Sequence, residues 1–146
     1  MIYLGIDQSF TSTGWCIVNH KAGLLSFGVI KTTADEEIFD RMEKIRDVLV
    51  EVVSYYKPTV IAMEGLAFNI QGAATRDLAG LQAVLMTSLK VNGVRPMVFA
   101  PTTVKKFATG SGGNGADKKA MWEALPASVQ GEIIKAGFGR KSLGMY

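Results

Sequence analysis

Apolar residues and polar breaks divide the first half of the chain into short strands and one long helix. Residues 1–6 form an apolar, partly β-branched run that ends at Asp7, and residues 14–18 and 24–30 form two further runs between polar turns. Such short runs at close spacing are typical of antiparallel strands joined as hairpins. From residue 35 to about 56, apolar side chains recur every three or four positions, which predicts an amphipathic helix.

The boundaries of this helix and the next strand follow from capping and proline signals. Thr33 or Asp35 is the expected cap at the helix start, and Lys57-Pro58 is expected to end it. Residues 59–63 are again β-branched and apolar, which predicts a fourth strand, directly followed by Glu64.

The second half of the chain predicts a mostly apolar helix, a fifth strand and shorter helices. Residues 72–91 form a helix that is apolar around most of its circumference, which indicates a central position or a subunit interface. A strand is expected at 95–100, a short helix from Pro101 to Phe107 with Thr102 as its N-cap, and another helix at 116–125. A glycine-rich segment occupies 109–115, and the pattern after 126 is mixed.

This order of elements predicts an α/β fold, with a mixed five-stranded sheet flanked by helices. The 146 residues, 48% of them hydrophobic, fit a single domain with one core. One cysteine, Cys16, cannot form an internal disulfide, and we expect a cytoplasmic protein. No apolar run approaches the roughly 20 residues of a membrane span, which excludes a membrane-spanning protein. The hydrophobic content and the single cysteine exclude the collagen-like, disordered and disulfide-rich classes.

Charge is divided unevenly along the chain, although the net value is only +3. Residues 1–73 contain 6 Lys or Arg and 9 Asp or Glu, whereas residues 74–146 contain 10 and 4, giving −3 and +6. Carboxylates beside a phosphate-binding face would produce this division, and so would an accident of solvated surface.

Two acids stand at the ends of predicted strands, Asp7 after the first and Glu64 after the fourth. If these strands are parallel neighbours, both carboxylates reach one sheet edge, where open α/β sheets bind ligands. Hard divalent cations such as Mg²⁺ favour oxygen ligands of this kind. Histidine or cysteine catalysis is disfavoured, because His20 falls in a predicted surface turn and Cys16 has no base beside it.

Several motifs, in order, resemble the RuvC family of Holliday-junction resolvases within the RNase H-like superfamily. The first motif is Leu-Gly-Ile-Asp-Gln-Ser-Phe-Thr-Ser-Thr-Gly-Trp at residues 4–15. It is followed by Ile-Ala-Met-Glu at 61–64, Ala-Gly-Leu-Gln-Ala at 79–83, Ala-Pro-Thr-Thr-Val-Lys-Lys at 100–106 and Ala-Asp-Lys at 116–118. The resemblance runs from about residue 2 to 125 and implies a metal-dependent endonuclease that cleaves Holliday junctions or other branched DNA.

The resemblance also implies a role for each matching residue. Asp7 and Glu64 would bind Mg²⁺, for which Mn²⁺ can substitute, and position the attacking water. Lys105 and Lys118 would lie near the scissile phosphate. Lys106 and Lys119 would contact other phosphates, and Phe68 would stack on a junction base. The family further implies a homodimer through the helix at 72–91 and a place in the cytoplasm of a bacterial cell or a phage-infected host.

The chain departs from the family pattern at two places. Gln8-Ser9 stands where the family usually has Pro-Gly. The family takes its remaining metal-binding acids from a final helix, whereas no acid follows Glu132 here, so we expect a domain that lacks this helix and is impaired or inactive. Asp117 matches the position before a lysine rather than these acids.

Three other functions share some of these features. A non-catalytic module that binds branched DNA would account for the missing acids, and a related RNase H-like ribonuclease would share the acids and the fold. The Gly-Ile-Asp motif also resembles sugar and acetate kinases, but 146 residues cannot supply their two domains.

Overall fold

The computed structural model describes residues 1–66, 72–90, 92–113 and 116–138. These residues fall into two compact units, unit 1 (Met1–Ala100) and unit 2 (Pro101–Tyr146). The boundary follows a strand and precedes a proline, without a Gly- or Ser-rich linker in the sequence. The prediction of one domain over residues 1–146 stays a prediction.

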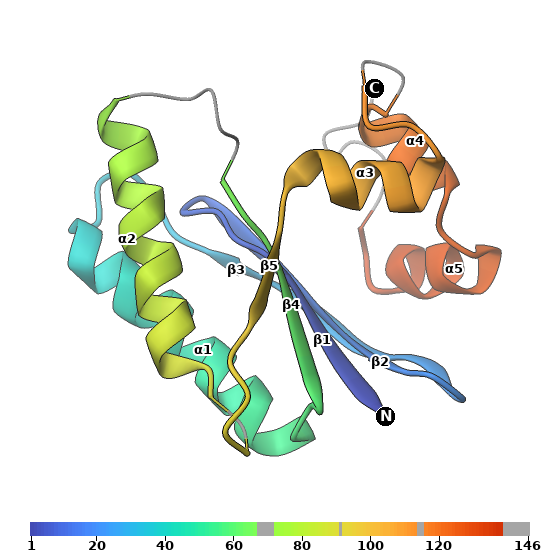
Figure 1. Cartoon of the computed structure of the whole chain (residues 1–146), viewed down its shortest axis with the longest axis horizontal. Coiled ribbons are helices and arrows are strands. Elements are labelled where there is room, and N and C mark those ends of the chain that lie inside the picture. Colours follow the sequence, from blue (N-terminus) through green and yellow to red (C-terminus); the bar gives the residue numbers. More distant parts are fainter. Residues whose placement is uncertain (67–71, 91, 114–115, 139–146) are drawn as a thin grey trace. The chain divides into compact units, whose positions relative to one another are not determined.

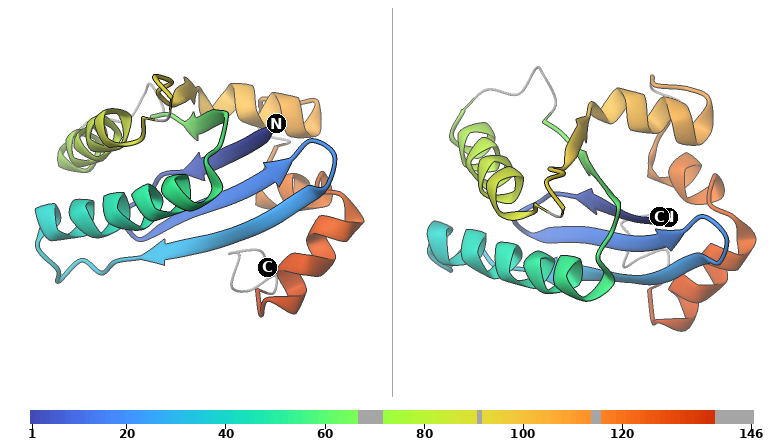
Figure 2. Two further views of the ribbon diagram at one scale, coloured as in Figure 1. Left: turned by 90° about the horizontal axis from the view of Figure 1, so that it is seen from below. Right: turned by 60° about the horizontal axis from the view of Figure 1, so that its bottom comes forward.

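Within residues 1–66, 72–90 and 92–100, unit 1 is a five-stranded sheet with two helices (Figure 1). The sheet order is β3-β2-β1-β4-β5, with β2 antiparallel to β1 and β3, and β4 parallel to β1 and β5. Figure 2 shows the long hairpin of β2 and β3. The elements are β1 (Ile2–Asp7), β2 (Ser12–Asn19), β3 (Gly23–Lys31), α1 (Ile38–Tyr56), β4 (Val60–Glu64), α2 (Ala73–Ser88) and β5 (Met97–Phe99). The predicted mixed five-stranded sheet is therefore confirmed.

The core of unit 1 lies between one face of the sheet and the helices α1 and α2. Alternate residues of the strands are buried there, including Leu4, Ile17 and Ile61, together with Leu49 of α1 and Leu81 of α2. Each is at most 2% exposed. Alternation along a strand sends the intervening side chains to the opposite face. None of the described helices is long and apolar enough to cross a membrane.

The predicted start of α1 is wrong. The helix begins at Ile38, and Glu37 caps it by accepting hydrogen bonds from the amides of Phe39 and Asp40. Thr33 instead donates its backbone amide to Glu36 Oε1 at 2.7 Å, so the residues before the helix form a separate turn. The predicted end is confirmed, with Lys57 as the C-cap before Pro58.

The described residues of unit 2 form three short helices: α3 (Pro101–Thr109), α4 (Lys118–Glu123) and α5 (Ala127–Lys135). Thr102 is not an N-cap as predicted, because proline fits the first helical position and α3 therefore begins at Pro101. The predicted helix at 116–125 is shorter at both ends: Asp117 accepts from the amide of Ala120 and caps α4, which ends before Pro126. The sequence pattern did not predict α5.

Candidate functional site

The two predicted acids are direct neighbours across the centre of the sheet. Asp7 and Glu64 are the last residues of β1 and β4, and they are register partners in this parallel pair. Neighbouring strands are about 4.8 Å apart, and paired residues of parallel strands point to the same face. The predicted convergence of the two acids at one sheet edge is confirmed, whereas their roles stay predictions.

Both acids point away from the helices of unit 1. Ile6 and Met63, the residues before them, are 4% and 1% exposed on the helix side, so alternation places Asp7 and Glu64 on the other face. Asp7 is exposed and Glu64 is half-buried. Gly14 pairs with Asp7 in the neighbouring strand, and this glycine leaves the space beside the carboxylate without a side chain.

The loop after Asp7 is fixed by hydroxyl groups. The amide of Ser9 donates to Thr13 Oγ1 at 3.2 Å, and the Thr13 hydroxyl donates back to the Ser9 carbonyl. The Thr32 hydroxyl donates to the Phe10 carbonyl and accepts from Arg41 Nε at 2.8 Å. These bonds hold the loop against β2 and α1, so the chain directly after Asp7 is anchored.

The acid pair fits a hard divalent cation. Mg²⁺ commonly binds through one or two carboxylates and keeps several waters or phosphate oxygens as its other ligands. Asp7 and Glu64 supply two carboxylates at adjacent backbone positions. Within the described ranges, no group of three or more His, Cys, Asp or Glu side chains could hold a metal ion.

Unit 2 carries the four predicted lysines on two helices. Lys105 and Lys106 lie on α3, which contains no acidic residue, and Lys118 and Lys119 form the first turn of α4. Lys105 is half-buried and the other three are exposed. Lys119 is 3.8 Å from the Glu123 carboxylate in an exposed pair, which holds the ammonium group only weakly.

The glycine-rich segment begins folded against α3. Gly110 takes a left-handed conformation (φ 79°), and its amide donates to the Lys106 carbonyl at 2.8 Å. A Cβ on Gly112 would stand 3.1 Å from the Thr102 carbonyl oxygen, so only glycine packs here without displacement. The Thr109 hydroxyl connects α3 to the glycine-rich segment, because it donates to the Lys105 carbonyl and accepts from the Ser111 amide at 3.2 Å. The described part of this segment therefore extends the surface of α3.

The other predicted site residues have simpler outcomes. Phe68 lies outside the described residues. His20 is exposed in the turn after β2, as predicted. Burial raises the pKa of the Cys16 thiol, outweighing a backbone hydrogen bond from Gly5, which disfavours the thiolate needed of a nucleophile. The carboxylate of Asp117 caps α4.

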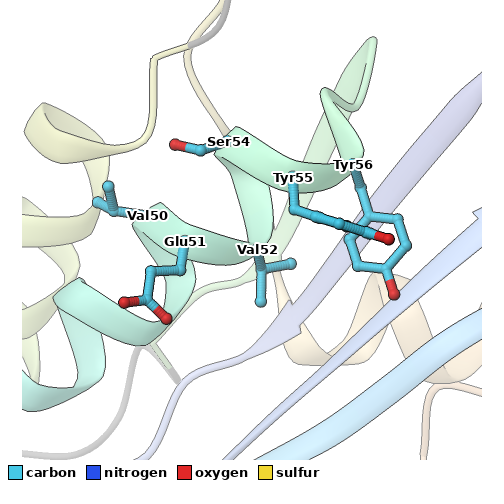
Figure 3. A pocket seen from close by; sticks show the side chains of 6 residues that line it. All are labelled: Val50, Glu51, Val52, Ser54, Tyr55 and Tyr56. Atoms are coloured by element: carbon cyan, nitrogen blue, oxygen red, sulfur yellow. The ribbon is translucent and has the colours of Figure 1, made fainter.

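A surface hollow of about 580 Å³ lies on α1, away from the acid pair. Its lining residues come from the C-terminal end of that helix, between Val50 and Tyr56 (Figure 3). This end precedes the start of β4, whereas Glu64 is at the opposite end of the strand. The hollow is therefore not part of the acid site.

Two glutamines beside the acids were not assigned a role from the sequence. Gln8 is only 7% exposed, and its Nε2 donates to Gln82 Oε1 of α2 at 2.9 Å. A buried side chain at position 8 was not predictable from a polar turn. The only available signal was the departure from Pro-Gly after Asp7.

The family assignment comes from the sequence comparison. The family model described as crossover junction endodeoxyribonuclease RuvC matches residues 3–125, which is most of the chain. The chain belongs to the RuvC family. RuvC of Rickettsia bellii strain RML369-C is 33% identical over 115 residues, covering 77% of this chain and 73% of its own length. RuvC of Rickettsia conorii is 29% identical over 137 residues, covering 92% and 86%.

Solved structures support the same fold. RuvC of T. thermophilus, in complex with a Holliday junction substrate, superimposes with a TM-score of 0.71 at 22% identity, covering 99% of this chain and 80% of that one. A further structure of Thermus thermophilus RuvC gives a TM-score of 0.67. The RNase H-like architecture expected from the RuvC motifs is thus confirmed.

Proposed function

We propose that this chain is a metal-dependent, structure-selective endodeoxyribonuclease that cleaves Holliday junctions or other branched DNA by phosphodiester hydrolysis. The observation that carries the proposal is the register pairing of Asp7 and Glu64 at the ends of β1 and β4, in a chain of the RuvC family. Two carboxylates anchored at a sheet edge suit a reaction in which a cation must be held against a polyanion.

Asp7 and Glu64 would hold the cation, which we take to be Mg²⁺, with Mn²⁺ as a substitute. When bound there, a divalent cation lowers the pKa of a coordinated water and neutralises charge on the phosphodiester. Gly14 beside Asp7 leaves room for the substrate backbone, and the hydrogen-bonded loop after Asp7 keeps that carboxylate in place. The two acids would thereby orient the water that attacks phosphorus.

The lysines of unit 2 would act on the DNA. Lys105 and Lys118 stabilise the negative charge that develops at the scissile phosphate, because a cation is worth most where charge grows in the transition state. Lys106 and Lys119 contact other phosphates, and their exposure supports this assignment. Phe68 is proposed to stack on a junction base.

We further propose that residues 1–146 form one RNase H-like nuclease domain that acts as a homodimer in the cytoplasm. The family match runs across the boundary between the two units, which favours one functional domain.

One side of α2 packs into the core through Leu81 and Leu85, while the small residues Ala79 and Ala83 are exposed and would let a second helix approach closely. Sedimentation at micromolar concentration tests the dimer, and a monomeric mass would contradict it.

Cleavage of synthetic substrates tests the proposed reaction. With two acidic ligands in the described ranges, the wild type with Mg²⁺ should cut a four-way DNA junction slowly, and should cut a linear duplex of the same sequence or a structured RNA far less. Asp7→Asn should bind the junction and fail to cut it. Full activity of Asp7→Asn would refute the catalytic assignment. If the wild type binds the junction in a salt-sensitive way but does not cleave it in Mg²⁺ or Mn²⁺, the protein is a binding module. If the wild type cleaves RNA in preference to DNA, it is a ribonuclease.

A further inference from the structure

Phe107 on α3 is the most exposed large hydrophobic side chain among the described residues. It is 96% exposed, whereas the next in order, Tyr55 of α1, is 80% exposed and ends in a polar hydroxyl. Single exposed apolar residues are ordinary on protein surfaces, and exposure alone indicates no function. The residues around Phe107 are what make its exposure informative.

Phe107 lies on the polar side of α3. The half-buried residues of this helix recur at helical spacing along the other side: Pro101, Val104, Lys105 and Thr109. The side that carries Phe107 is exposed throughout: Thr102, Thr103, Lys106 and Phe107. The ring therefore shares its side of the helix with a cation and two hydroxyl groups rather than with other large apolar side chains.

The described segment after α3 leaves the ring uncovered. A Cβ on Gly112 would stand 3.1 Å from the Thr102 carbonyl oxygen and 3.7 Å from Lys106 Cβ, so this part of the segment lies against the exposed side of the helix. From Gly110 to Gly113, Ser111 is the one residue with a side chain. A planar group could therefore approach the Phe107 ring without displacing a bulky side chain of this segment.

The charge around Phe107 favours an anionic partner. No Asp or Glu occurs in the sequence from residue 78 to residue 116, and Lys105 and Lys106 directly precede the phenylalanine. An exposed aromatic ring beside lysines is a combination by which proteins bind unpaired nucleobases, because the ring stacks on the base while a cation pairs with the backbone phosphate. The exposed side of α3 thus has the chemistry of a nucleotide-binding surface.

We propose that Phe107 stacks on an unpaired nucleobase of branched DNA, while Lys106 contacts the adjoining phosphate. This inference rests on the proposed function, and it adds a contact to the one proposed for Phe68, which comes from a different segment of the chain. A base beside a branch point lacks part of the continuous stack of a linear duplex, so less energy is needed to unstack it. Phe107 therefore favours branched or single-stranded DNA over a linear duplex.

Fluorescence anisotropy of labelled DNA, without divalent metal, tests the proposal by binding alone. Phe107→Leu keeps an apolar side chain and removes the ring, so the Kd for a four-way junction and for single-stranded oligothymidylate should rise about 10-fold. The Kd for a linear duplex, which offers no unpaired base, should stay within about 2-fold of the wild type. Phe107→Trp provides a larger ring and should bind the junction at least as tightly as the wild type.

Salt dependence separates stacking from charge. Phe107→Leu should leave the slope of log K against log salt unchanged, because stacking on a base releases no counterions. Lys106→Ala should make the slope shallower by about 1, because it removes one phosphate contact. A change of slope in Phe107→Leu as large as that in Lys106→Ala would contradict the proposal.

Phe39→Leu is the matched control. Phe39 is 65% exposed and also lies on a helix, but this helix is α1, where its neighbours Glu37 and Asp40 are acidic. The variant should bind all three DNAs like the wild type. If Phe39→Leu weakens junction binding as much as Phe107→Leu does, the loss is a general effect of removing an exposed ring and the proposal is wrong.

The outcomes separate this inference from the proposed function. An unchanged junction Kd in Phe107→Leu, or an equal loss on the junction and the linear duplex, would overturn the stacking role and leave the nuclease assignment intact. A smaller sedimenting species than the wild type would show that Phe107 joins copies of this chain, and would overturn that role too. Junction binding without cleavage by the wild type, weakened about 10-fold in Phe107→Leu, would overturn the nuclease assignment and support the stacking role. Failure of the wild type to bind any of the three DNAs would overturn both.

Discussion

Unit 1 carries its proposed catalytic charges at the ends of buried strands, whereas unit 2 carries its charges on exposed helical turns. Unit 1 has 9 Lys or Arg and 10 Asp or Glu, a net charge of −1, and unit 2 has 7 and 3, a net charge of +4. The core of unit 1 contains many fully buried side chains, but Ala116 is the one buried residue among those described in unit 2.

This difference separates the two tasks of a nuclease. A metal site needs ligands held to a fraction of an ångström, and strands packed in a core provide such rigidity. Phosphate binding needs positive charge on accessible side chains and tolerates less exact geometry. Substitutions at the acid edge should therefore change chemistry, and substitutions of Lys106 and Lys119, which are proposed to contact other phosphates, should change affinity.

Removing one acid should have the largest effect. Glu64→Gln keeps the shape of the side chain but removes a charged ligand, so we expect cleavage of a four-way junction to fall by at least about 100-fold. Junction binding without divalent metal should stay within about 3-fold of the wild type. Single-turnover experiments measure cleavage, and a gel-shift titration measures junction binding. Equal losses of cleavage and of metal-free binding would show that Glu64 acts on DNA binding rather than specifically on the chemistry.

Crowding the strand beside the acid should be the next largest effect. In Gly65→Ala the new Cβ would meet Val98 Cγ1 at 2.6 Å, and such overpacking costs about 1–3 kcal/mol of unfolding free energy. Urea denaturation measures this cost. A stability equal to that of the wild type would mean that β4 and β5 are not packed as described.

Removing exposed charge from unit 2 should have a moderate effect on DNA binding. The double variant Lys106→Ala/Lys119→Ala should weaken junction binding, and the slope of log K against log salt should become shallower by about 1 for each lost phosphate contact. The control is Lys135→Ala, which removes an exposed lysine of α5 whose ion pair with Glu132 at 3.7 Å matches that of Lys119 with Glu123 at 3.8 Å. An equal change of slope in the control would indicate general charge rather than the α3 and α4 lysines.

The smallest expected effect is a gain in stability in unit 2. Gly131 lies inside α5, and a Cβ there would meet nothing within 4 Å. Because alanine favours the helix more than glycine does, Gly131→Ala should stabilise α5 by about 0.5–1 kcal/mol. Hydrogen exchange of the α5 amides measures this gain, and unchanged protection would contradict it.

The sequence predicted the sheet and the meeting of the acids because both depend on strong, long patterns. Because Asp7 and Glu64 directly follow apolar strands, a parallel arrangement of these strands leaves little freedom in where the two carboxylates lie. Helix starts were less predictable, because several polar residues before α1 compete for the same amides and Glu37 is the one that binds them. The strand expected at 95–100 shrank to β5, since Pro96 has no amide hydrogen to donate to the ladder.

Features that depend on tertiary contacts could not be predicted. Gln8 reads as a turn residue in sequence, and only the approach of Gln82 and the Glu64 carbonyl explains its burial. The division after Ala100 has no compositional signal, because it arises from the distribution of contacts.

Cleavage rate as a function of enzyme concentration tests the central claim most directly. We would measure single-turnover cleavage of a four-way junction by the wild type, Lys106→Ala/Lys119→Ala and Glu64→Gln with Mg²⁺. If Glu64 acts in the chemistry and Lys106 and Lys119 provide affinity, the lysine variant reaches the wild-type rate at saturating enzyme, whereas Glu64→Gln stays at least about 100-fold slower. Recovery of Glu64→Gln at saturation would contradict the account.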